Sequence, residues 1–169
     1  LLTGLAGLDA PFVSMHNERQ NQTYDIARHV FRLGWKGIIT PQATFSVPDN
    51  PRQPFTVSRL EVPFHGLFGW PIAALTGHDR SAVRLVSIAF GIFSILLLYL
   101  VLRREVGCRP ALVGVAVWAT SPLLLHFGQV PMPDILTTTG VLAAYYLALR
   151  GNLSGASGTF LFALLAKPS

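Results

Sequence analysis

The stretch SAVRLVSIAFGIFSILLLYLVL, residues 81–102, decides the fold class because it is almost entirely apolar. A helix needs about 20 such residues to cross the hydrocarbon core of a bilayer. The short loop after the stretch contains Arg103, Arg104 and Arg109. Short loops with an excess of arginine and lysine stay on the cytoplasmic side. The sequence therefore predicts a transmembrane helix whose carboxyl end faces the cytoplasm.

Four further apolar segments flank this helix, at residues 1–8, 110–127, 135–149 and 155–169. We expect the first to be the outer end of a preceding transmembrane helix. The next two form a short pair of spans, which we expect to be tilted or partly buried in protein, and the last begins another crossing. The sequence thus predicts an all-α, multi-pass fragment, in which residues 1–169 are the N-terminal part of a single larger membrane domain.

Composition excludes several other classes of protein. Hydrophobic residues make up 51% of the chain and charged residues only 12%, about half the charged share of a soluble domain. The net charge is +5, but the arginines are scattered along loops beside apolar segments. This pattern favours membrane lipid or phosphate over nucleic acid as the partner. The single cysteine, Cys108, excludes an internal disulfide framework.

Residues 9–80 form one long polar segment, which the topology places on the extracytoplasmic side. Apolar residues at helical spacing predict a helix over residues 17–33 that ends before Gly34. The stretch 41–54 is rich in Pro, Asn and Gln and predicts an irregular loop. Residues 58–75 predict a second, amphipathic helix, whose aromatic side chains suit the headgroup layer of the membrane.

Three acids on this outer side are candidates for chemistry. Glu18 lies at the start of the first predicted helix and Glu61 at the start of the second. Asp134 follows two prolines in the turn 129–134, which the topology places on the same side. A carboxylate in reach of a hydroxyl group can act as its general base. The simpler interpretations are an N-cap at Asp134, a solvated ion pair of Glu61 with Arg59, and an ordinary first-turn acid at Glu18.

Arginines on the same side are candidates for binding phosphate, because the forked guanidinium matches phosphate oxygens and keeps its charge. These candidates are Arg19, Arg59 and Arg84. Arg84 lies inside the first turn of the apolar stretch, where a charge is costly and usually has a partner or a function. The alternative is that its side chain snorkels to the lipid headgroups.

His65 lies four residues after Glu61, so the two side chains can face one ion if both are helical. A divalent metal ion is therefore compatible with the pattern, although an ordinary hydrogen-bonding histidine is the simpler interpretation. The sequence has no Gly-rich phosphate loop and no nucleotide-binding fingerprint. A soluble nucleotide as sugar or phosphate donor is not supported, and no resident cofactor is indicated.

An ordered series of short motifs runs along the chain. Its members are Arg19-Gln20-x-x-Thr23, Glu61-Val62-Pro63-Phe64, Arg84-Leu85-Val86-Ser87, Ser121-Pro122-Leu123, Met132-Pro133-Asp134 and Lys167-Pro168. In order and spacing the series resembles the GT-C glycosyltransferases of family 39, which use polyprenyl-phosphate sugars. That family includes protein O-mannosyltransferases and the aminoarabinose transferases of lipid A.

The resemblance implies an inverting transfer of a sugar from a polyprenyl phosphate to a hydroxyl of a lipid, glycan or protein. It further implies a site on the outer face of a plasma membrane, here a bacterial inner membrane. Glu61 and Asp134 match acids that position the acceptor or a metal. Where relatives carry the aspartate of the general base, this chain has Gln22. Either Glu18 takes that role from upstream, or the protein works differently or is inactive. Gln22, like His65, is a positioning candidate.

Two other classes of function stay open at this point. A transporter or flippase for polyprenyl-phosphate lipids also needs arginines that bind phosphate, but it breaks no bond. Such proteins place charged groups and broken helices at the middle of the membrane, whereas the acids here gather at one surface. A non-catalytic membrane scaffold is the third class.

Overall fold

The computed structural model describes residues 17–34, 36–39, 44–46, 54–56 and 62–166. In chain order the elements are α2 (Asn17–Leu33), α3 (Lys36–Ile39), β1 (Thr44–Ser46), β2 (Pro54–Thr56), α4 (Phe64–Thr76), α5 (Asp79–Val106), α6 (Cys108–Thr120), α7 (Pro122–Phe127), α8 (Pro133–Leu149) and α9 (Leu153–Ala166). Helices dominate this part of the chain, as the sequence predicts.

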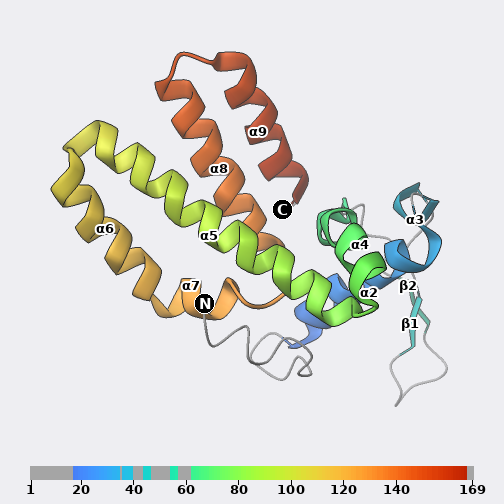
Figure 1. Cartoon of the computed structure of the whole chain (residues 1–169). Coiled ribbons are helices and arrows are strands. Elements are labelled where there is room, and N and C mark those ends of the chain that lie inside the picture. Colours follow the sequence, from blue (N-terminus) through green and yellow to red (C-terminus); the bar gives the residue numbers. More distant parts are fainter. Residues whose placement is uncertain (1–16, 35, 40–43, 47–53, 57–61, 167–169) are drawn as a thin grey trace.

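The central element is α5, the long helix that crosses the middle of the molecule in Figure 1. Its 28 residues span roughly 42 Å at about 1.5 Å per residue. Among the described helices it is the one long and apolar enough to cross a membrane, whereas α6 and α9 are apolar but shorter. The helix predicted at 81–102 is confirmed and extends further at both ends. It carries Asp79 in its first turn and Arg103 and Arg104 in its last, charges that suit the helix dipole.

The prediction of one continuous helix over residues 110–127 is wrong in detail, because the structure divides this segment into α6 and α7. Ser121 is extended, with φ −63° and ψ 137°. The residue before a proline disfavours the α conformation, and Pro122 has no N–H to continue the helix. The Ser121 hydroxyl accepts a hydrogen bond from the Leu124 N–H at 3.2 Å and caps the new helix.

Helices α8 and α9 form an antiparallel hairpin beside α5. Gly151, with φ 77°, closes the turn between them, and the Asn152 side chain accepts from the Gly155 N–H at 2.9 Å. The close approach of the two helices depends on Gly140, since a Cβ there would lie 2.9 Å from the Cβ of Ala163. The helix predicted at 135–149 is confirmed and begins at Pro133.

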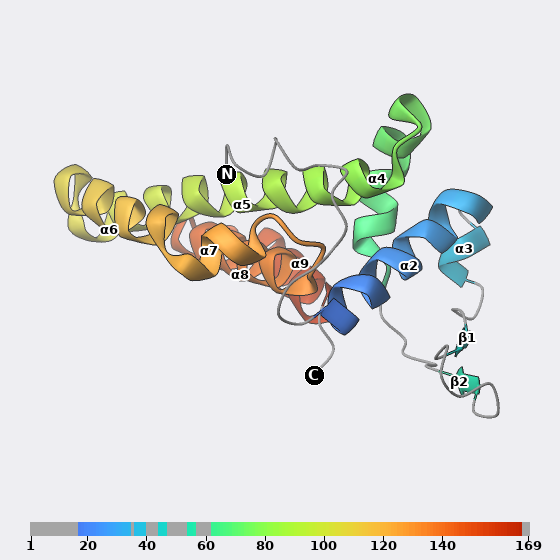
Figure 2. The same ribbon diagram turned by 90° about the horizontal axis from the view of Figure 1, so that it is seen from below.

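At the amino end of α5 lie α2, α3 and α4, and the arginine-rich turn between α5 and α6 lies at the opposite end (Figure 2). The helix predicted at 17–33 is confirmed at both ends, with Gly34 at φ 60° as its stop. In the stretch predicted as an irregular loop, β1 pairs antiparallel with β2 as a short ladder. The helix predicted from residue 58 begins only at Phe64, because Val62 and Pro63 are not helical.

Small residues hold α2 against α4 and α5. Ala27 is fully buried and packs against Val83 of α5. Gly66 of α4 lies so close to α2 that an added Cβ would be 2.9 Å from the Cβ of Val30. Arg28 on α2 and Asp79 on α5 add an exposed ion pair at 3.8 Å. These contacts fix the position of the first turn of α4, where the candidate site lies.

Candidate active site

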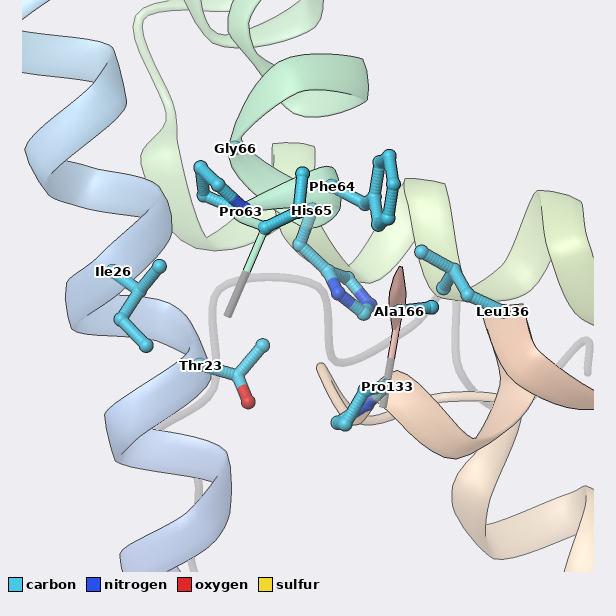
Figure 3. Close-up of a pocket in the computed structure, with 10 residues that line it drawn as sticks. Thr23, Ile26, Pro63, Phe64, His65, Gly66, Pro133, Leu136 and Ala166 are labelled. Atoms are coloured by element: carbon cyan, nitrogen blue, oxygen red, sulfur yellow. The ribbon is translucent and has the colours of Figure 1, made fainter. Parts of the chain in front are cut away.

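A small pocket opens where α2, the start of α4, α8 and the end of α9 meet (Figure 3). It is lined by Thr23, Ile26, Val62, Pro63, Phe64, His65, Gly66, Pro133, Leu136 and Ala166. Its cavity volume is about 20 Å³, which is room for about one water molecule or one hydroxyl group. The pocket therefore marks where these segments converge and does not by itself hold a whole sugar.

Two of the predicted acids adjoin this pocket in the sequence. Val62, the residue after Glu61, and Pro133, the residue before Asp134, both line it. Glu61 itself lies outside the described residues. The pocket nevertheless brings the two segments to the same end of the helix bundle, as the predicted topology requires.

His65 is the most deeply placed polar group of the pocket, with 4% of its surface exposed. Its Nε2 lies 3.1 Å from the hydroxyl of Ser87 on α5. Burial lowers the pKa of His65 from its usual 6.5 to about 4, since a charged imidazole loses its hydration there. At neutral pH His65 is therefore an uncharged hydrogen-bonding group. Helix α4 begins at Phe64 and Glu61 lies outside the described residues, so the pairing of His65 with Glu61 stays a prediction.

The lowered pKa of His65 predicts a loss of stability in acid. The imidazole of residue 65 binds a proton near pH 6.5 in the unfolded chain and only near pH 4 in the folded protein. The free energy of unfolding is therefore unaffected by this group above pH 6.5 and decreases as the pH falls toward 4. The loss amounts to roughly 3 kcal/mol. Thermal unfolding of the purified protein between these pH values measures it.

The matched comparison replaces His65 and the exposed His78 by glutamine in separate variants. We expect His65→Gln to reduce the acid-dependent loss of melting temperature and His78→Gln to leave it intact. Equal pH dependence of wild type and His65→Gln contradicts the prediction.

Asp134 lies in the first turn of α8 and is half-buried. The N-cap residue of α8 is Met132, which makes no side-chain capping bond. The simpler interpretation of Asp134 as the N-cap is therefore wrong. Its carboxylate stands where the helix dipole favours a negative charge, beside the pocket residue Pro133.

Arg84 lies in the second turn of α5 and is 9% exposed. The snorkelling interpretation is wrong for this side chain, because it is buried among the helices. Ser87, the partner of His65, follows Arg84 by about one helical turn on the buried face of α5. Arg84 thus lies on the face of α5 that also carries Ser87, the hydrogen-bond partner of the pocket residue His65.

The remaining predicted site residues are less fully described. The backbones of Glu18, Arg19 and Gln22 belong to α2, the helix that also supplies Thr23 to the pocket. Arg59, like Glu61, lies outside the described residues. Within the described residues no group of three or more His, Cys, Asp and Glu side chains is arranged to hold a metal ion.

Sequence reasoning missed two buried hydroxyl groups that organise this end of the bundle. Ser87 bonds His65. The Thr139 hydroxyl of α8 is shared between the Ile135 carbonyl at 2.7 Å and the Phe90 carbonyl of α5 at 3.1 Å. A signal for Ser87 is visible in the sequence, since Ser81, Arg84 and Ser87 recur every three residues in an otherwise apolar helix. That spacing places them on one face.

Comparison with known proteins adds a family. A family model described as dolichyl-phosphate-mannose-protein mannosyltransferase matches residues 58–167. The match includes Glu61, Arg84 and Asp134 and leaves out α2, so the α2 part of the motif series is not covered by it. No curated protein and no solved structure matches the chain. Because the matched region is more than half of the chain, the protein belongs to the dolichyl-phosphate-mannose-protein mannosyltransferase family, a family of membrane glycosyltransferases of the GT-C type.

Proposed function

We propose that the protein transfers a sugar from a polyprenyl-phosphate donor to an acceptor hydroxyl on the extracytoplasmic face of a bacterial inner membrane. The observation that carries this proposal is the convergence of Val62 and Pro133 on one pocket. Val62 follows Glu61 and Pro133 precedes Asp134 in the sequence, so we propose that the two acids act at one site. Two carboxylates at the end of a membrane helix suit proton transfer and acceptor positioning at a lipid-linked sugar.

The proposed reaction is a single displacement with inversion. A carboxylate takes the proton from the acceptor hydroxyl, and the oxygen attacks the anomeric carbon of the sugar. The bond between that carbon and the phosphate oxygen breaks, and its electron pair leaves with the phosphate. Glu61, Asp134 and Glu18 are the proposed acids. A well-placed general base contributes about 10²–10⁴-fold to such a step.

Arginines are proposed to stabilise the leaving phosphate as its charge develops. A fixed guanidinium in a site with little water stabilises such charge strongly. Arg84 is the best supported of the three candidates, because it is buried near the amino end of the apolar helix α5. The proposal places it near the membrane surface, where a guanidinium can bind a lipid phosphate while the polyprenyl chain stays in the bilayer. Arg19 and Arg59 complete the proposed set.

A divalent cation is a candidate partner of the two acids Glu61 and Asp134, and its chemistry would be charge neutralisation at the phosphate. Within the described residues no metal-binding cluster forms, so a site for the ion would need Glu61 as well. Transfer measured with and without EDTA tests this part of the proposal.

The test of function uses membranes that contain the whole protein and radiolabelled polyprenyl-phosphate mannose. We expect label to move from the lipid into an acceptor fraction, and membranes without the protein provide the control. Movement of intact labelled lipid to the other leaflet, with no new glycosidic product, would instead identify a flippase. Neither transfer nor movement in membranes that contain the protein favours a scaffold and contradicts the proposal.

A further inference from the structure

The two ring nitrogens of His65 have different surroundings. Nε2 lies 3.1 Å from the Oγ of Ser87. That same hydroxyl donates its hydrogen to the Val83 carbonyl at 3.3 Å, so its oxygen is left to accept. A neutral imidazole that donates through Nε2 carries a free lone pair on Nδ1. The bond to Ser87 therefore selects the tautomer in which Nδ1 is an acceptor.

The acceptor Nδ1 belongs to a ring that lines an otherwise apolar pocket. Figure 3 shows the imidazole extending from α4 toward Pro133 and Ala166. Thr23 is the other lining residue with a polar side chain. In the part of the chain that the structure describes, the imidazole has no hydrogen bond besides that to Ser87. Nδ1 is therefore available to accept a hydrogen bond from a ligand that supplies a donor.

We propose that Nδ1 of His65 accepts a hydrogen bond from a sugar or acceptor hydroxyl group, so that His65 is a positioning residue of the transferase site. This inference rests on the proposed function. The volume of the pocket suits it, since about 20 Å³ admits one hydroxyl group. An uncharged acceptor also selects for hydroxyl groups and does not compete with the arginines for the phosphate.

A purely structural role of His65 is the alternative, in which the bond to Ser87 only fastens α4 to α5. Two amide variants separate these roles. His65→Gln places an amide N–H near the position of Nε2, where it can donate to Ser87, but it has no acceptor at the position of Nδ1. His65→Asn places its amide oxygen near the position of Nδ1, but its shorter side chain does not reach Ser87.

Steady-state kinetics and melting temperatures of the whole protein in detergent give the readouts. We expect His65→Gln to raise the KM for the substrate that carries the hydroxyl by about tenfold, the factor for one hydrogen bond of ~1.4 kcal/mol, with little change in melting temperature. We expect His65→Asn to keep that KM within about threefold of wild type and to melt lower, as Ser87→Ala should. The inference is overturned if His65→Asn, the variant that melts lower, also has the higher KM.

A binding measurement identifies the source of the hydroxyl and does not depend on transfer. Each variant is titrated with polyprenyl-phosphate mannose and with polyprenyl phosphate that lacks the sugar. If the sugar strengthens binding to wild type and His65→Asn but not to His65→Gln, the donor supplies the hydroxyl. If only the KM for the acceptor responds, the acceptor supplies it.

Different measurements distinguish failure of the proposed function from failure of this inference. If the wild type transfers no sugar, the proposed function fails, and the titration alone decides on His65. The inference fails, even where transfer is robust, if two results are found together. The first is that the sugar changes lipid binding equally in wild type and both variants, and the second is that the two amide variants have the same KM.

Discussion

Replacing Asp134 by asparagine is expected to lower sugar transfer by about 10²–10⁴-fold, the range for loss of a carboxylate that takes part in proton transfer. Asparagine keeps the size of the side chain and its place in the first turn of α8, but it cannot accept a proton at neutral pH. The measurement is the initial rate of transfer from radiolabelled polyprenyl-phosphate mannose, in membranes with matched amounts of whole protein.

The control for this variant is Asp79→Asn, the same change in the first turn of another helix. Asp79 is 37% exposed and pairs with Arg28 at 3.8 Å, so its loss costs at most about 1 kcal/mol of stability. We expect near wild-type transfer from it. A wild-type rate in Asp134→Asn, or an equal loss in both variants, contradicts the proposed role of Asp134.

Glu61→Gln is expected to lower the rate by a similar factor of about 10²–10⁴, because Val62 joins the segment of Glu61 to the same pocket as Pro133. The matched control is Glu105→Gln, an exposed acid at the opposite end of α5. Wild-type rates in both Glu61→Gln and Asp134→Asn would refute the site as a whole.

Gly66→Val is expected to have the second large effect, on folding and transfer together. A Cβ at residue 66 would lie 2.9 Å from the Cβ and Cγ2 of Val30 and 3.1 Å from the Cα of Ala27. Backbone atoms cannot turn aside, so α4 must move away from α2. Overpacking of this kind costs about 1–3 kcal/mol or more, which corresponds to a fall in melting temperature of roughly 2–12 °C.

The same displacement moves His65 and the other pocket residues around the start of α4, so we expect transfer to fall below detection. Gly158→Val is the matched control, since Gly158 lies inside α9 with nothing within 4 Å of an added Cβ. Valine has a higher helix propensity than glycine, and this variant should melt at or slightly above the wild-type temperature. Equal melting temperatures of the two variants contradict the packing argument.

The elements that the sequence predicted well are those set by local rules. The bounds of α2 were predicted at both ends, because apolar spacing and the stop at Gly34 act within one helix. Helix α5 was predicted from an apolar run that no other local structure accommodates. The predicted multi-pass arrangement stays a prediction, since α5 is the one described helix that meets the length for a span.

Two predictions were wrong because the length of an apolar stretch was given more weight than the prolines within it. The segment 110–127 was predicted as one helix although Pro122 interrupts it, and the structure breaks it at Ser121. The helix predicted from residue 58 begins only after Pro63. In both cases the missing N–H and the restricted residue before proline outweighed the continuous apolar pattern.

For the site, the sequence supplied residue types and a predicted side of the membrane but no distances. It singled out Asp134 and Arg84, and a family match covers both positions. It gave His65 as a partner of Glu61 through helical spacing, whereas the structure pairs His65 with Ser87 from another helix. A contact between residues 22 positions apart leaves no periodic trace in either segment, so local patterns did not reveal it.

The amino-acid sequence alone determined the helical class, the apolar helix α5 and the glycine stops, because these follow from side-chain hydrophobicity and backbone freedom within a few residues. Only the tertiary structure decided that Thr23, Val62 and Pro133 share one pocket and that His65 is buried and neutral. The close contacts at Gly66 and Gly140 set how near the helices approach. Such packing depends on the shapes of distant segments, which no short stretch of sequence contains.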